Sequence, residues 1–108
     1  VFVKPFNPFM AETLISNLLI NAVKHNIPQG FIDIETTTDS IVLTNSGPSL
    51  QSNPDELFKR FKKDHPTADS PGLGLSIVQS ICRQNGLEVK YRYKEKSHFI
   101  KITNHTEP

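Results

Sequence analysis

The sequence has little of what builds several common kinds of site. It has one cysteine, Cys82, and no tryptophan. A lone cysteine excludes a disulfide framework and a cysteine-based zinc cluster, and it favours a reducing compartment. The net charge is only +1, so no strong field attracts nucleic acid or a membrane surface. No apolar run approaches the roughly 18 residues of a membrane span, and no signal peptide is visible at the start. We therefore expect a cytoplasmic domain with no nucleic-acid partner and no direct membrane contact.

The length and apolar content of the chain fit one domain with one core. The chain has 108 residues, and 36% of them are hydrophobic, which is above the content typical of disordered segments. It opens within an apparent strand and without an initiator methionine. We therefore expect residues 1–108 to form a single monomeric domain cut from a longer protein.

The apolar periodicity and the turn signals predict strands and helices in a definite order. Strands are predicted at 1–3, 31–37, 41–45, 88–94 and 98–103, and helices at 9–25, 54–61 and 72–84. Strand pairs joined by hairpins, with helices collected between them, favour a protein that contains both helices and strands (α/β), with the strands paired as in the α+β class. The predicted architecture is a two-layer sandwich in which helices cover one face of a mixed sheet.

The segment from about 46 to 71 is mostly loop. One short helix signal interrupts it, because Asn53 can cap a helix, Pro54 suits the first helical position and Glu56 stands three residues after the cap. A stretch of this length is unusual inside a compact domain, and it predicts a functional lid.

The helix predicted over 9–25 carries aligned polar residues. At about 100° per residue, Asn17, Asn21 and Lys24 fall together on one edge, with His25 at the border of the apolar side. Magnesium bound to phosphate takes hard oxygen ligands and needs few protein contacts, so this edge is a candidate metal site. The alternative is a solvated face, since asparagine is mostly exposed. The apolar side is predicted to be one continuous buried arc, made of Leu14, Leu18, Ala22, Ile15, Leu19 and Val23.

Glycines open the last predicted helix, in the run Gly72-Leu73-Gly74-Leu75-Ser76. The free N–H groups and the dipole at a helix start favour an anion, and glycine lets phosphate approach the backbone closely. The alternative is a tight turn with no ligand.

Two further features lie within or beside the predicted lid. The second strand of the hairpin ends at Asn45, and Gly47 follows two residues later. A polar side chain there can accept a hydrogen bond from an adenine amino group, although a plain turn is the alternative. Phe58 and Phe61 lie three apart among four cations. They either anchor the lid to the core, beneath a solvated basic face, or help the cations to grip a nucleotide.

The order and spacing of these features resemble the catalytic ATP-binding domain of sensor histidine kinases, a relative of the gyrase, heat-shock chaperone and mismatch-repair ATPases. The likeness runs from about Asn7 to Thr103. It implies the Bergerat-type ATP-binding fold, with ATP and Mg²⁺ as ligands. Asn21 would be the principal magnesium ligand with Asn17 beside it, so these two are the expected catalytic residues. The implied nucleotide contacts are Asn17, Asn21, Lys24, His25, Asn45, Gly47, Phe58, Phe61, Gly72, Leu73, Gly74 and Leu75.

The resemblance also assigns roles and exposes departures. Lys24 would contact phosphate, and the ring of His25 would lie against the adenine. The sequence departs from the family's glycine motifs because Asn45 stands where the family has Asp, and Ser49 and Ser70 stand where it has Gly. A neutral amide accepts a hydrogen bond more weakly than a carboxylate, so these changes put tight ATP binding in question.

The activity implied by the resemblance is phosphoryl transfer in a two-component system. The domain would supply the γ-phosphoryl group of ATP to a histidine on a separate dimerisation and histidine-phosphotransfer domain, with a response regulator downstream. None of the four histidines is followed directly by Asp or Glu, as the family's acceptor usually is, so we expect no autophosphorylation. The parent would be a homodimer, and its anchorage in the inner membrane stays open.

Two alternatives remain at this stage. The first is a degenerate module of the same fold that holds nucleotide poorly or not at all and signals by contact. The second is another ATPase of the superfamily or a serine kinase. Asn17 disfavours it, because those ATPases have a water-activating Glu at that position and an amide is no general base.

Overall fold

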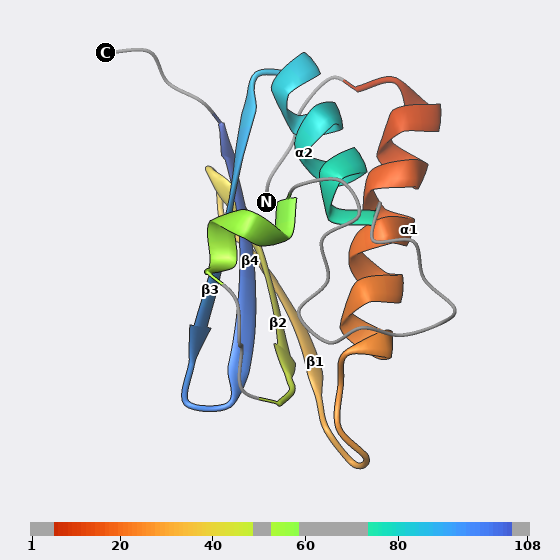
Figure 1. Cartoon of the computed structure of the whole chain (residues 1–108). Coiled ribbons are helices and arrows are strands. Elements are labelled where there is room, and N and C mark those ends of the chain that lie inside the picture. The colour runs from red at the N-terminus through yellow and green to blue at the C-terminus, as the bar shows by residue number, and fades with distance from the viewer. Residues whose placement is uncertain (1–5, 49–52, 59–73, 105–108) are drawn as a thin grey trace.

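The computed structural model describes residues 6–48, 53–58 and 74–104. The elements, in chain order, are α1 (Pro8–Lys24), β1 (Ile32–Thr36), β2 (Ser40–Ser46), the 3₁₀ helix η1 (Pro54–Phe58), α2 (Gly74–Gln84), β3 (Leu87–Lys94) and β4 (Ser97–Asn104) (Figure 1). Each predicted element that lies in the described part is present, and the ends that can be compared differ by at most one residue. The predicted helix at 54–61 and the helix opened by Gly72 each extend beyond the described residues at one end. The predicted strand at 1–3 lies outside the described residues.

The four described strands form one sheet in the order β1-β2-β4-β3. The prediction of a mixed sheet is wrong for these strands, because every neighbouring pair among them is antiparallel. The reason is topological. Two hairpins, β1–β2 and β3–β4, supply the antiparallel pairs, and β4 lies between β2 and β3. Strands β2 and β3 run in the same direction, but they do not pair with each other because β4 separates them.

Both helices cover one face of the sheet (Figure 1), so the predicted two-layer α+β sandwich is confirmed. The core lies between these layers. It is built from side chains of α1, α2, η1 and three strands: Leu14, Leu18, Ala22, Leu43, Leu57, Phe58, Val78, Ile81, Cys82, Leu87, Val89, Tyr91, Ile100 and Ile102. No helix in the described part of the chain is long and apolar enough to cross a membrane.

Helix α1 begins one residue earlier than expected because of its cap. The Oδ1 atom of Asn7 accepts from the backbone N–H of Phe9 at 2.8 Å, and Pro8 stands at the first helical position. Both features are favourable at a helix N-terminus, where four backbone donors lack partners within the helix.

The continuous buried arc predicted for α1 is half wrong. The row Leu14, Leu18 and Ala22 is buried, whereas Leu19 is 36% exposed and Val23 is 66% exposed. The cause is the placement of α1, which packs chiefly against α2 and has fewer contacts with the sheet. One apolar row therefore faces the core and the next row faces outward.

Candidate nucleotide-binding site

Helix α1 brings Asn17, one of its two predicted magnesium ligands, to the start of α2. The Nδ2 of Asn17 donates to the Thr13 carbonyl at 2.8 Å, which turns its Oδ1 outward from the helix axis. A Cβ atom at position 74 would lie 3.2 Å from that Oδ1. Because Gly74 is the first residue of α2, the asparagine row and the glycine-led helix start, predicted separately from the sequence, lie side by side.

The oxygen atoms of this row are available for a ligand. Within the described ranges, the side chain of Asn21 makes no hydrogen bond, and the Oδ1 of Asn17 accepts none. Asn17 and Asn21 lie one helical turn apart and are both half-buried. Two adjacent amide oxygens without donors fit a hard cation that keeps most of its ligands from phosphate and water. Lys24 ends the same helix and is exposed, where its charge can reach a phosphate.

Asn45 offers a buried acceptor at the end of β2. Its side chain is 2% exposed, and its Nδ2 donates to the Ser46 carbonyl at 2.9 Å. In the part of the chain that the structure describes, its Oδ1 accepts no hydrogen bond. A buried acceptor left without a donor is costly, so this position suits a donor supplied by a ligand or an ordered water.

Gly47 lets the end of β2 approach the end of α1. A Cβ at this position would lie 2.7 Å from the His25 carbonyl oxygen and 2.7 Å from the Cδ2 atom of His98. Only glycine fits between these two groups without a shift. The predicted site residues His25 and Gly47 are therefore neighbours, and a larger residue at 47 would push them apart.

A hydrogen-bond network fixes this junction, and it involves residues that the sequence reasoning missed. The Ser46 hydroxyl donates to Asn26 Oδ1 at 2.5 Å and accepts from the Phe31 N–H at 2.8 Å. Asn26 Nδ2 in turn donates to the Phe31 carbonyl at 2.9 Å. Sequence patterns do not predict this contact of Asn26, because no local spacing relates residues that lie twenty positions apart.

Helix η1, which lies in the region predicted as the lid, is anchored to the core by Phe58. Phe58 is 6% exposed, and its ring packs edge-on against Tyr91, with centroids 6.4 Å apart. This packing favours the anchoring alternative for Phe58 over direct contact with a nucleotide. Leu75 is half-buried and packs against the core. The other predicted residues of the lid and glycine segment lie outside the described residues: Ser49, Phe61, Ser70, Gly72 and Leu73.

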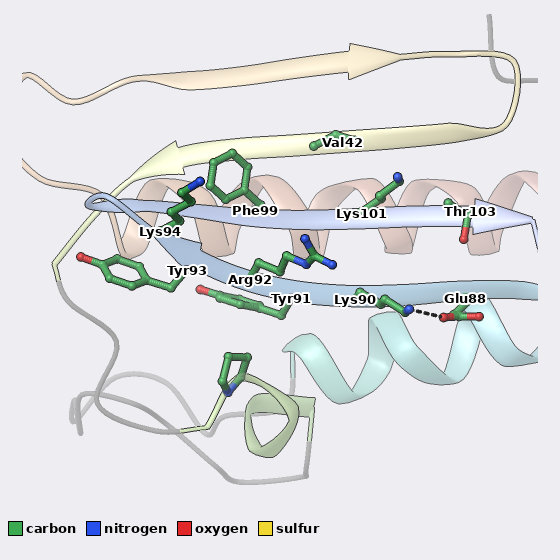
Figure 2. Close-up of a pocket in the computed structure, with 11 residues that line it drawn as sticks. Val42, Glu88, Lys90, Tyr91, Arg92, Tyr93, Lys94, Phe99, Lys101 and Thr103 are labelled. Atoms are coloured by element: carbon green, nitrogen blue, oxygen red, sulfur yellow. Dashed lines mark ion pairs between the residues drawn. The ribbon is translucent and has the colours of Figure 1, made fainter.

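The hollow of about 680 Å³ around the β3 edge is a different feature (Figure 2). Its lining includes Arg92, Lys101 and the ion pair between Lys90 and Glu88, whose charged atoms lie 3.3 Å apart. These residues alternate with the buried residues of β3 and β4. They therefore belong to the face of the sheet that the helices do not cover, away from the asparagine row.

Comparison with known proteins places this arrangement in a family. Residues 7–106 match the model of the histidine kinase-, DNA gyrase B- and HSP90-like ATPases. The chain is 35% identical over 97 residues to the sensor protein QseC of Escherichia coli K12, which covers 85% of this chain and 21% of QseC. It is 31% identical over 99 residues to the sensor protein CutS of Streptomyces coelicolor, covering 82% and 24% of the two chains. The chain thus spans about a fifth to a quarter of the length of these relatives.

Solved structures show the same fold. The catalytic domain of the histidine kinase ThkA, in a nucleotide-free form, superimposes with a TM-score of 0.72 at 23% identity, over 94% of this chain and 70% of that one. The cytoplasmic segment of the histidine kinase QseC gives a TM-score of 0.68 at 22% identity, over 95% and 50%. With a family match over nearly the whole chain, an asparagine row against a helix start and a two-layer α+β fold, this chain belongs to the histidine kinase-, DNA gyrase B- and HSP90-like ATPases.

Proposed function

We propose that this chain binds ATP with Mg²⁺ and serves as the catalytic domain of a two-component sensor histidine kinase. The observation that carries the proposal is the apposition of Asn17 Oδ1 and Gly74. It joins a pair of amide oxygens to the start of α2, so a cation and a phosphate chain can be held at one place. The relatives that share the family with this chain are sensor kinases, which supports the same assignment.

The residues divide between the two ends of the nucleotide. Asn21 and Asn17 would hold Mg²⁺, which neutralises charge on the phosphates when bound. The N–H groups at the start of α2 and the Lys24 ammonium would face the phosphates. At the other end, Asn45 Oδ1 would accept from the adenine amino group, and Gly47 leaves room beside His25.

The proposed reaction is transfer of the γ-phosphoryl group to a histidine on the dimerisation domain of the parent, and from there to a response regulator. The domain itself contributes positioning and charge neutralisation, which dominate phosphoryl transfer. Hydrolysis is disfavoured because Asn17, bonded through Nδ2 to the Thr13 carbonyl, cannot remove a proton from water.

A second candidate, a degenerate signalling module, follows from Asn45. This amide replaces the carboxylate expected from the family, and its buried setting offers one neutral acceptor. Affinity for nucleotide separates the two candidates.

Calorimetric titration with a non-hydrolysable ATP analogue, with and without Mg²⁺, tests the proposal. We expect saturable binding in the range of tens to hundreds of micromolar, about −5 to −6 kcal/mol, that strengthens with Mg²⁺. Asn21→Ala should abolish the metal dependence, whereas Ser16→Ala, at an exposed position of the same helix, should leave it intact. Absence of binding up to millimolar nucleotide would instead support the degenerate module.

A further inference from the structure

The ring of His98 lies beside the end of β2, where the region predicted as the lid begins. His98 is 4% exposed and pairs across the sheet with Asn45 on one side and Tyr93 on the other. Its Nδ1 lies 2.8 Å from the Tyr91 hydroxyl oxygen, and its Nε2 lies 2.8 Å from the Pro48 carbonyl oxygen. Pro48 lies within the region predicted as the lid, 46–71, and is the last residue described before position 53.

The two contacts define the state of the imidazole. A backbone carbonyl can only accept, so the proton must be on Nε2 for the bond to Pro48. In the neutral form of the ring the lone pair is at Nδ1, which can accept from the Tyr91 hydroxyl. Neighbouring rings restrain rotation, since the Tyr91 ring lies 5.8 Å away at 79° and the Tyr93 ring lies 4.7 Å away.

The same ring determines where the backbone after Asn45 can lie. The backbone at Gly47 lies close to the ring, because a Cβ at this position would be 2.8 Å from His98 Nε2. The Gly47 N–H donates to the Lys96 carbonyl at 3.1 Å. The segment 47–48 is therefore tied to the β3–β4 hairpin at two successive residues, directly after the buried acceptor of Asn45.

We propose that His98 is a positioning residue for nucleotide binding. Its Nε2–H bond to the Pro48 carbonyl, oriented by Tyr91, holds residues 45–48 so that the Asn45 oxygen faces the adenine and the chain leaves the sheet in a fixed direction. This inference rests on the proposed function. It goes beyond that function because His98 touches no part of the proposed ligand and acts through Asn45, Gly47 and Pro48.

Three variants of the 108-residue chain test the role. His98→Phe keeps a ring in the core but removes both hydrogen bonds. His98→Gln keeps an N–H donor that can reach the Pro48 carbonyl. Tyr91→Phe removes only the hydroxyl that orients the imidazole. Phe99→Leu, on the other face of β4, controls for general disturbance of the sheet.

We expect His98→Phe to weaken binding of the ATP analogue roughly tenfold, the size of one lost hydrogen bond in a buried site. His98→Gln should recover most of the affinity. The affinity of Tyr91→Phe should lie between those of His98→Phe and the unmodified chain, and Phe99→Leu should bind as the unmodified chain does. Urea unfolding of each variant checks that the affinities refer to folded protein. A purely structural role would lower stability in His98→Phe and leave affinity unchanged, and that result would overturn the proposal.

A second measurement decides the matter if His98→Phe does not fold. The ¹⁵N shifts and two-bond couplings of the His98 ring in the unmodified chain should show the proton on Nε2. Tyr91→Phe should then weaken both that signature and the protection of the Gly47 amide from exchange. A proton found on Nδ1 would overturn the proposal. Failure of the unmodified chain to bind nucleotide, together with an intact Nε2–H signature, would refute the proposed function and leave the contact standing as a structural one.

Discussion

The amide of Asn45 is held by a hydrogen bond from its Nδ2 to the Ser46 carbonyl at 2.9 Å. This bond matters because an unrestrained amide could flip and offer either a donor or an acceptor. Held this way it offers an acceptor, which matches the amino group of adenine and opposes the carbonyl oxygen of guanine. If the proposed function holds, this residue would therefore set base preference as well as affinity.

We expect Asn45→Leu to lower ATP affinity roughly tenfold, since one buried hydrogen bond to the base is lost. Affinity for GTP should change little, so the preference for ATP should shrink. Parallel titrations with the ATP and GTP analogues measure the ratio, and Thr44→Val, one residue earlier in β2, is the matched control. An unchanged ratio would show that the base does not meet this side chain.

Cys82 is fully buried in α2, and burial raises the pKa of its thiol from 9.0 to about 11. The thiol thus stays protonated in the folded state where an unfolded chain would already ionise. Its contribution to stability is present below about pH 9 and is lost as the pH rises toward 11, because the unfolded state then releases the proton more readily.

The expected loss from Cys82 is about 2–3 kcal/mol of unfolding free energy between those limits. Urea titrations at pH 8, 9, 10 and 11 measure it, with Cys82→Ala as the control that should lose less over the same range. Slow alkylation of the native chain at pH 8, compared with the chain in denaturant, gives an independent check. Equal pH dependence in both proteins would assign the effect to other groups.

At the scale of elements, α1 shows which side of a helix carries its stability. Leu18 is 2% exposed and faces the core, while its neighbour Leu19 is 36% exposed and faces outward. Leu18→Ala should lower the free energy of unfolding by roughly 2–5 kcal/mol. Leu19→Ala should cost much less because the outward side chain buries less apolar area. Denaturant unfolding of the two single variants compares the same chemical change on adjacent residues, and equal costs would mean that both rows of α1 are covered.

The sequence predicted the elements better than their packing. Local signals located both hairpins, the cap at Asn53 and the stop after Gln84, since caps and turns depend on neighbouring residues. The exposed position of Leu19 was missed because a 3.6-residue period marks apolar rows without showing how many rows another element covers. The antiparallel sheet was missed for the same kind of reason, since strand order depends on pairing between distant segments.

The site itself was predictable only in part. Asn17, Asn21 and Asn45 stood out because their spacing matched a known pattern of motifs. The roles of Ser46, Asn26 and His98 depend on contacts between residues far apart in sequence, such as the 2.5 Å bond from Ser46 to Asn26. No period or turn rule encodes such a contact.

At the scale of the whole molecule, the proposed site is built from several elements. In the proposed site, α1 would supply the asparagine row, β2 the acceptor for the base and α2 the helix start, and the residues concerned are spread from Asn17 to Gly74. The site therefore exists only when the two layers have packed together. Any ligand that binds it must stabilise the fold as a unit, because an unfolded chain presents no such arrangement.

This linkage gives a prediction for the intact domain. At a free ATP-analogue concentration one hundred times the dissociation constant, the free energy of unfolding should rise by about 2.7 kcal/mol. The rise should be largest with Mg²⁺ and should shrink when EDTA removes the metal. Without ligand, Asn21→Ala should be as stable as the unmodified chain, because its side chain lies off the buried row of α1. Adding ligand should raise its free energy of unfolding only slightly, because the proposed metal ligand is missing. Leu18→Ala should melt lower yet keep the increment once the ligand concentration is scaled to its own affinity. If instead the increment is unchanged by EDTA and by Asn21→Ala, the nucleotide is held without the asparagine row, and the metal site proposed at α1 is wrong.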